Sequence, residues 1–315
     1  MEKQAKLVEL NDFRSPTNGE VFYYTVKDGT KIRVAIWNKN ALNGTIILQS
    51  GRTEFIEKYY EVIQEIINRN YCVAMFDWRG QGLSDRLTSN KYLGHVNKFQ
   101  DYDLDLHEIF IEIFSKSCPQ PFIGMAHSMG GSIMASYASK KDTPLIGLIL
   151  CAPMLNIPIP KIMKFIIQIV GFFSWLGFRD LPLSRPEWNK KRGWHEISFN
   201  ENNVTSDENR YTRTSNLIKK EDNLALGGLS IGWSHSAYLR TNSHNKKWAK
   251  SIKIPTLVLC AMKDQLINSQ LTIELCSNIP NHTIIEIQGE HELLMEKDNI
   301  RKECWEKIDN FLQKL

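Results

Sequence analysis

Six short apolar runs, each about the length of a β-strand, recur along the 315-residue chain between polar turns. They lie at residues 45–49, 71–76, 122–126, 145–152, 256–261 and 283–287. Apolar runs of this length, rich in Val, Ile or Leu, are typical of strands that are covered on both faces of a sheet. Segments with helical periodicity, such as residues 55–67 and 305–312, lie between or after the runs. This alternation predicts an α/β fold, with a mostly parallel sheet and helices on both of its faces.

Two further strand-like segments near the start of the chain flank a turn signal. Residues 21–26 and 31–37 are separated by Lys27-Asp28-Gly29-Thr30, and an Asp-Gly pair is favoured in the tight turn of a β-hairpin. The two strands of a hairpin are antiparallel neighbours. We therefore expect an antiparallel edge beside the parallel part of the sheet.

The alternation of strand and helix stops after Pro153 and resumes at Ile254, which leaves roughly a hundred residues without a convincing strand. An insertion of this kind interrupts the repeating pattern but not the domain that surrounds it. We interpret residues 154–250 as an inserted lid. Residues 1–153 and 251–315 are then the two parts of the core domain.

The predicted lid contains an apolar stretch and an excess of positive charge. Residues 162–178 are mostly apolar, but at 17 residues the stretch is at or below the minimum for crossing a bilayer. A helix that covers a pocket or lies on a membrane surface fits better, and a helix packed into the core is the alternative. Residues 157–250 hold 15 Lys and Arg against 8 Asp and Glu, a net charge of +7. We therefore expect either a solvated polar face or peripheral contact with an anionic membrane.

The overall composition is that of an ordinary globular protein, with 42% hydrophobic and 23% charged residues, so a disordered or fibrous chain is not expected. The six cysteines are dispersed, with no C-x-x-C pair and no cluster with histidine, which predicts reduced, mostly buried thiols and no metal site. Residues 1–16 lack the apolar segment of a secretory signal, which favours a cytoplasmic location. A nucleic-acid role is not expected, since the sequence has no such motif or basic helix. The oligomeric state stays open.

The most informative motif is Ala126-His127-Ser128-Met129-Gly130, which follows an apolar strand and precedes a helix-compatible segment. It matches the nucleophile elbow G-x-S-x-G, except that alanine replaces the first glycine. In such an elbow a serine lies on a tight strand-to-helix turn, and small neighbours are needed because the chain passes close to itself. The motif predicts that Ser128 is a catalytic nucleophile.

A serine hydroxyl needs a base to take its proton, and the base needs an acid to orient it. Asp264 follows the predicted strand at residues 256–261, and His291 follows the one at residues 283–287. Both therefore lie beyond the carboxyl end of a strand, where open α/β sheets bind their ligands. The chain order Ser, Asp, His is the order used by α/β-hydrolases. The sequence thus predicts a triad of Ser128, Asp264 and His291.

Other residues fit the roles of acid and base less well. Asp77 and Asp103 precede Ser128 and do not follow the expected chain order. His127 adjoins the serine, but we expect its side chain to point away from it. The remaining histidines lie in the predicted lid, between early strands or just before a strand; they are His95, His107, His195, His235, His244 and His282.

Acyl transfer also requires N–H donors for the negatively charged oxygen of its intermediate. One donor is normally the residue after the nucleophile, here Met129, and the other comes from an early loop that follows a strand. The predicted strand at residues 45–49 continues into Ser50-Gly51-Arg52, where Gly51 would let the loop turn inward. The backbone N–H groups of Arg52 and Met129 are the predicted donors, with an ordinary glycine turn as the alternative.

Taken together, several motifs resemble the lysophospholipase L2 and monoacylglycerol lipase branch of the α/β-hydrolases over nearly the whole chain. They are Ser50-Gly51-Arg52-Thr53-Glu54 with Lys58-Tyr59, Asp77-Trp78-Arg79-Gly80-Gln81-Gly82-Leu83-Ser84, Ala126-His127-Ser128-Met129-Gly130-Gly131, Lys263-Asp264-Gln265, and His291-Glu292-Leu293-Leu294-Met295-Glu296. The last motif is nearer to lysophospholipase L2. Ser50-Gly51 departs from the His-Gly that is usual in monoacylglycerol lipases.

The resemblance implies a serine hydrolase without metal or cofactor that uses the same triad and the same two N–H donors. It implies an ester substrate with one fatty acyl chain, lysophospholipid first and monoacylglycerol second, and a structural loop at residues 77–84. Ala126 should change the packing beneath the elbow more than the chemistry. Soluble carboxylesterases and proline-specific peptidases share the fold and stay as alternatives, because fold does not decide substrate. A non-catalytic lipid-binding protein is a more remote alternative.

Overall fold

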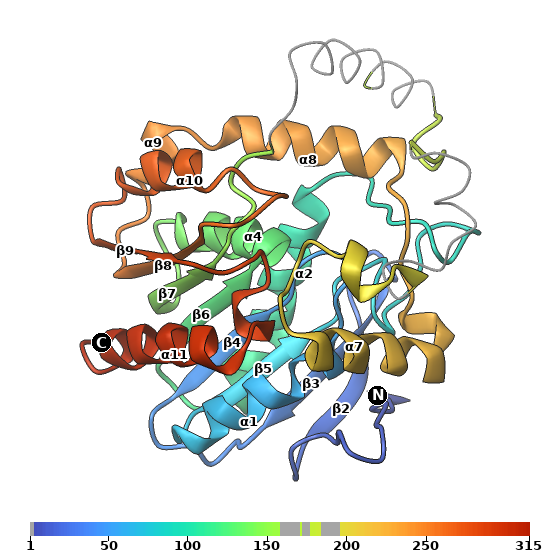
Figure 1. Cartoon of the computed structure of the whole chain (residues 1–315), viewed down its shortest axis with the longest axis horizontal. Helices are drawn as coiled ribbons and strands as arrows, with labels where there is room; N and C mark the ends of the chain where they lie inside the picture. The colour runs from blue at the N-terminus through green and yellow to red at the C-terminus, as the bar shows by residue number, and fades with distance from the viewer. Residues whose placement is uncertain (1–2, 158–170, 172–176, 184–195) are drawn as a thin grey trace.

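The computed structural model describes residues 3–157, 171, 177–183 and 196–315. Its centre is a nine-stranded sheet in the order β1-β2-β3-β5-β4-β6-β7-β8-β9 (Figure 1). The strands are β1 (Lys3–Gln4), β2 (Glu20–Thr25), β3 (Lys31–Trp37), β4 (Thr45–Gln49), β5 (Cys72–Phe76), β6 (Phe122–His127), β7 (Leu145–Cys151), β8 (Thr256–Ala261) and β9 (His282–Ile287). Strands β5, β4, β6, β7, β8 and β9 pair in parallel, whereas β3 is antiparallel to both β2 and β5. The predicted α/β class is confirmed.

Each of the six apolar runs forms one strand of the parallel part, with bounds that match or differ by one residue from the prediction. The predicted hairpin is β2 and β3, joined by a turn in which Val26 N–H donates to Thr30 O at 3.0 Å. Gly29 has a φ of 89°, a left-handed conformation that favours glycine. The Asp-Gly signal therefore marks the turn correctly.

Helices cover both faces of the sheet. In chain order they are η1 (Ile56–Tyr59), α1 (Tyr60–Asn68), α2 (Gln100–Ile109), η2 (Phe110–Phe114), α3 (Ser115–Ser117), α4 (Ser128–Ala138), η4 (Phe199–Glu201), α7 (Glu208–Lys220), η5 (Asp222–Leu224), α8 (Ile231–Ser243), α9 (Lys246–Ala249), α10 (Ser269–Cys276), η6 (Leu293–Met295) and α11 (Asp298–Leu312). Helices α1 and α11 lie on one face, and α2 and α4 lie on the other (Figure 1).

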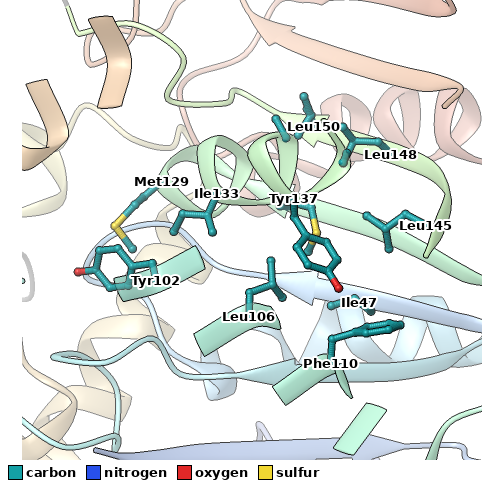
Figure 2. Packing of buried hydrophobic residues seen from close by; sticks show 14 of the residues in the cluster. Ile47, Tyr102, Leu106, Phe110, Met129, Ile133, Tyr137, Leu145, Leu148 and Leu150 are labelled. Atoms are coloured by element: carbon teal, nitrogen blue, oxygen red, sulfur yellow. The ribbon is translucent and has the colours of Figure 1, made fainter. Parts of the chain in front are cut away.

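The core lies in two layers because successive side chains of a strand point to opposite faces. In β4, Ile46 and Leu48 belong to the cluster that contains α1 and α11, and Ile47 belongs to the cluster that contains α2 and α4. Figure 2 shows part of the second cluster, which includes Ile47 of β4, Leu106 of α2 and Tyr137 of α4. Burial of each such aliphatic side chain contributes roughly 1.5–3 kcal/mol. Both faces of the strands are therefore apolar, as the sequence indicates.

The order of the central strands has a topological switch point between β4 and β6. Strands β4 and β6 are neighbours, but the helices that follow them, α1 and α4, cover opposite faces. The loops after the two strands diverge there, and open α/β sheets bind ligands at such a point. These two loops carry Arg52 and Ser128.

The described part of residues 154–250 contains α7, α8 and α9 and contributes no strand to the sheet. Leu217 and Ile218 of α7 pack with the α1 cluster, while Trp233 and Ala237 of α8 pack with the α2 and α4 cluster. The segment thus contacts both layers of the core. The predicted helix at residues 162–178 lies almost wholly outside the described residues, and the boundaries of the lid stay a prediction.

The six cysteines are all buried and none is in a disulfide, which confirms the expected free thiols. Among the described residues, no three or more His, Cys, Asp and Glu side chains are grouped as a metal site would need. None of the helices in the described ranges combines the length and apolarity that a membrane span would need.

Candidate active site

Ser128 lies at the junction of β6 and α4, in a strained turn. Its φ is 48°, a left-handed value that is uncommon for a residue with a side chain. The turn fits closely beneath the loop after β4, because a Cβ atom on Gly130 would lie 2.4 Å from the carbonyl oxygen of Ser50. Ser128 is 9% exposed. The structure therefore has the geometry of a nucleophile elbow, with glycine where only a hydrogen atom fits.

Hydrogen bonds join Ser128, His291 and Asp264 in one chain. His291 Nε2 lies 2.9 Å from Ser128 Oγ, and His291 Nδ1 lies 2.5 Å from Asp264 Oδ2. The acid and histidine loops follow the neighbouring strands β8 and β9, and Lys263 N–H donates to Gly289 O at 3.0 Å between them. Three side chains far apart in the sequence are thus brought together at the carboxyl end of the sheet.

Asp264 is held as a carboxylate. Its Oδ1 accepts hydrogen bonds from the backbone N–H groups of Leu266 at 2.7 Å and Ile267 at 2.9 Å. Burial raises the pKa of Asp264. The hydrogen bond from His291, the charge that His291 carries when protonated, and the two backbone N–H groups together outweigh burial, so the net pKa is below its ordinary value. An ionised Asp264 orients the imidazole with Nδ1 protonated and Nε2 free to accept a proton from Ser128.

The loop after β4 is fixed by hydrogen bonds that do not engage the N–H of Arg52. Trp78 Nε1 donates to Ser50 O at 2.9 Å, and Gln81 Nε2 donates to Gly51 O at 2.8 Å. The N–H of Gly51 donates to the carboxylate of Glu54. Within the described ranges, no hydrogen bond engages the N–H of Arg52, nor that of Met129, which is in the first turn of α4. Both groups are candidate donors to a ligand oxygen.

A buried charge cluster that the sequence reading did not assign a role lies behind this loop. Lys58 Nζ is 2.8 Å from Glu54 Oε1 and 2.5 Å from Glu292 Oε1, so it joins the loop after β4 to the residue next to His291. Burial of the carboxyl raises the pKa of Glu54, but the adjacent Lys58 ammonium outweighs it and lowers the pKa to about 2. The Glu54 and Lys58 spacing of four residues is visible in the sequence. Their contact with Glu292 has no local signal.

Glu296 organises the histidine loop in a similar way and is fully buried. Its Oε1 accepts from Glu290 N–H at 2.7 Å. Its Oε2 accepts from the N–H of Ser206 at 3.1 Å and from the Ser206 hydroxyl. Glu296 therefore connects the loop that carries His291 to the segment that we predicted as the lid. The sequence indicated it only as part of a family motif.

The rival acids lie elsewhere. Asp77 is buried and accepts from Arg33 Nε at 2.8 Å, Ile56 N–H at 3.0 Å and Leu83 N–H at 2.7 Å. Asp103 forms an ion pair with Arg240. Neither carboxylate is hydrogen-bonded to His291. Asp77 has the structural role in the loop at residues 77–84 that the resemblance implied.

His127 does not contact the serine hydroxyl: its Nδ1 lies 3.2 Å from Cys151 O, and its ring centroid is 4.7 Å from that of His291. Burial of the imidazole lowers the pKa of His127 to about 4, although the charge of Glu54 acts in the opposite direction. The buried ring is thus neutral at pH 7, and a charge there would face His291 at close range.

We expect the free energy of unfolding to fall as the pH drops from about 6.5 to about 4, in part because of His127. The unfolded imidazole binds a proton below its ordinary pKa near 6.5, whereas the folded one binds it only near 4, so acid favours the unfolded chain. The free energy of unfolding that His127 contributes at pH 7 and loses by about pH 4 is about 3 kcal/mol. Urea unfolding of the wild type and His127→Gln at pH 7, 6, 5 and 4 measures it. An equal fall of the free energy of unfolding in the wild type and in His127→Gln would contradict the assignment of this pH dependence to His127.

The order of the strands, the elbow after β6 and the loops after β8 and β9 are those of an α/β-hydrolase, which is the class of this protein. The chain belongs to the family described as serine aminopeptidase, S33 (Hydrolase_4), whose model matches residues 40–298. It is a hydrolase, and it is similar to curated lysophospholipases and to a curated monoglyceride lipase, as the resemblance implied.

Two curated relatives and one solved structure illustrate the similarity. The probable lysophospholipase L2 of Haemophilus influenzae is 27% identical over 98% of this chain and 96% of its own length. The lysophospholipase L2 of Escherichia coli is 25% identical over 92% of this chain and 86% of its own length. A soluble variant of monoglyceride lipase from Saccharomyces cerevisiae, in complex with a substrate analog, superimposes with a TM-score of 0.71 at 15% identity over 97% of this chain and 99% of that structure. At this identity the last similarity shows the fold alone.

Proposed function

We propose that the protein is a serine hydrolase that cleaves the carboxylic ester of a lipid with a single acyl chain, with lysophospholipid as the first candidate. The observation that carries the proposal is the hydrogen-bonded chain from Ser128 through His291 to Asp264. The N–H groups of Arg52 and Met129, which have no hydrogen-bond partner among the described residues, are the proposed oxyanion donors. The lipid substrate is supported by the curated relatives named lysophospholipase L2. A monoacylglycerol is the second candidate, supported by the relative named monoglyceride lipase.

In the first half of the proposed reaction, Ser128 Oγ attacks the ester carbonyl carbon while its proton passes to His291 Nε2. The carbonyl oxygen gains the negative charge and accepts hydrogen bonds from the N–H groups of Arg52 and Met129. His291 then gives the proton to the departing alcohol, and the acyl group stays on Ser128. In the second half, water gives a proton to His291 Nε2 as its oxygen attacks the acyl carbon. The bond between that carbon and Ser128 Oγ then breaks, His291 returns the proton to Ser128 Oγ, and the acyl group leaves as a fatty acid.

Two assays test the proposal. The purified protein should react covalently with a fluorophosphonate probe, and it should hydrolyse lysophosphatidylethanolamine, lysophosphatidylcholine, monoacylglycerol or short p-nitrophenyl esters. Faster hydrolysis of proline amides than of any ester would favour a peptidase. Absence of both probe labelling and hydrolysis would favour the non-catalytic lipid-binding alternative.

We further propose that the segment at residues 157–250 brings the enzyme to an anionic membrane surface in the cytoplasm. Its net charge of +7 supports this contact, and the six free thiols support a reducing compartment. We expect the protein to sediment with phosphatidylglycerol vesicles at about 0.05 M salt and to be released at about 0.5 M, because salt screens exposed charges. Equal binding to phosphatidylcholine vesicles, or binding that salt does not change, would contradict this.

A further inference from the structure

The side chain of Arg52, in the loop after β4, carries a positive charge that no carboxylate of the described residues balances. Its Nη2 donates to two carbonyl oxygens of the segment before α8, those of Gly227 and Gly228, the latter at 3.1 Å. The guanidinium carbon lies 5.3 Å from the ring centroid of Trp233. Its Nε is buried and has no hydrogen-bond partner in the part of the chain that the structure describes. Among the described residues, no Asp or Glu forms an ion pair with Arg52.

Two other arginines with buried side chains, Arg33 and Arg79, have partners of opposite charge. Arg33 pairs with Glu57 at 2.6 Å and with Asp77 at 2.6 Å, and Arg79 pairs with Asp105 at 2.5 Å. Those carboxylates hold the pKa of both arginines above the ordinary value, despite burial. For Arg52, burial instead lowers the pKa to about 10, and only the nearby Tyr102 hydroxyl opposes that fall. A buried cation of this kind is costly unless an anion arrives to pair with it.

Arg86 shows that the missing carboxylate alone is not the distinguishing feature. Burial also lowers the pKa of Arg86 to about 10, and carbonyl oxygens serve as its acceptors. However, each of its nitrogens has an acceptor: Nε donates to Lys91 O at 2.8 Å, Nη1 to Ser84 O at 3.5 Å, and Nη2 to Asn223 O. Arg86 is therefore satisfied within the protein, whereas Arg52 keeps an unused N–H donor.

The position of Arg52 defines what kind of anion could reach it. The proposed oxyanion donor is its own backbone N–H, so the guanidinium lies within one arginine side chain of the ester carbonyl. In a lysophospholipid, one glycerol unit separates that ester from the phosphate, which is a comparable span. A monoacylglycerol has a neutral hydroxyl group in place of the phosphate. The two candidate substrates thus differ in the phosphate, and an anion of this kind is the partner that Arg52 lacks.

We propose that the guanidinium of Arg52 binds the phosphodiester of a lysophospholipid and selects this substrate over a monoacylglycerol. The inference rests on the proposed esterase function and adds the group that determines its specificity. Arginine suits the task because its guanidinium donates paired hydrogen bonds to phosphate oxygens. The carbonyls of Gly227 and Gly228 and the ring of Trp233 hold the side chain in place, so that the charge is oriented before the substrate arrives.

The test compares kcat/KM for lysophosphatidylethanolamine and for a monoacylglycerol of the same acyl chain. In Arg52→Gln we expect the ratio of the two values to fall by about 10- to 100-fold, the effect of losing hydrogen bonds to a charged group. Arg52→Lys keeps the charge but not the paired geometry, so its ratio should fall less. Arg86→Gln is the matched control and should leave the ratio unchanged, because that arginine is satisfied by carbonyls.

Parallel loss of both activities in Arg52→Gln would overturn the inference, because it would make Arg52 only a structural link to the segment before α8. A ratio of the two kcat/KM values that stays unchanged in Arg52→Gln would also overturn it. If the variants do not fold, inhibition of wild-type monoacylglycerol hydrolysis by glycerol 3-phosphate, with glycerol as control, supplies the test, and equal effects of the two compounds would overturn it. Failure of the proposed function is a separate result: the wild type would then hydrolyse neither lipid.

Discussion

Ser128→Ala is expected to lower kcat for ester hydrolysis by about 10⁶, because no other group can form the covalent intermediate. The hydroxyl of Ser50, in the loop after β4, is not a substitute: it is fully buried and has no hydrogen-bond partner within the part of the chain described, so no base is in place to take its proton. The measurement is steady-state hydrolysis of a p-nitrophenyl ester, together with the loss of fluorophosphonate labelling.

His291→Ala should cost about as much, since members of a triad act as a unit. Both variants should keep the thermal unfolding profile of the wild type, because each removes only a few atoms from the rim of the sheet. Retention of more than about one hundredth of the wild-type kcat in Ser128→Ala would exclude Ser128 as the nucleophile, since even a triad without its nucleophile retains far less.

The sequence predicts the parallel part of the fold well because its information is local. Strands β4 and β8 follow from uninterrupted apolar runs, and the hairpin follows from Asp28-Gly29. The elbow is equally local, since strand, small residues and helix are consecutive at Ser128. The order of strands β5, β4 and β6, in contrast, depends on which strands pair across the sheet, and no short pattern encodes that order.

The parts of the site that sequence analysis missed all depend on contacts between distant segments. Lys58 contacts Glu54 four residues away, but its second partner, Glu292, is 234 residues distant. Glu296 similarly reaches Ser206 across 90 residues. Buried charges of this kind have no signal in composition or periodicity, because a polar residue in a sequence is expected on the surface. Only the assembled loops show that these carboxylates are internal.

The same argument explains why Arg52 was assigned only through its backbone. The Ser-Gly-Arg pattern after β4 predicts an N–H donor at Arg52, because the position of a backbone N–H depends on the path of the chain. The absence of a carboxylate partner is a property of the folded molecule, since the chain as a whole holds 35 Asp and Glu residues from which a partner could come. The charge of the Arg52 side chain therefore becomes informative only after its surroundings are known.

Asp264→Asn is expected to lower kcat by about 10⁴ while the fold is retained, and the reason lies in the three hydrogen bonds that the carboxylate accepts. Oδ1 accepts from the N–H groups of Leu266 and Ile267, so an asparagine would keep its carbonyl oxygen there and turn its NH2 group toward His291. The NH2 group needs an acceptor, which favours the imidazole tautomer with its proton on Nε2. That nitrogen faces Ser128 and could no longer take the serine proton.

The matched control is Asp103→Asn, which alters a carboxylate paired with Arg240 rather than with a histidine. We expect its kcat to stay within a factor of about three of the wild type, because a partly exposed ion pair contributes little. Loss of activity in Asp103→Asn or Asp77→Asn, with full activity in Asp264→Asn, would show that Asp264 is not the acid of the triad. A wild-type kcat in Asp264→Asn would mean that the imidazole keeps its tautomer without the carboxylate, and that the hydrogen bond at 2.5 Å between Asp264 and His291 only holds the loops after β8 and β9 together.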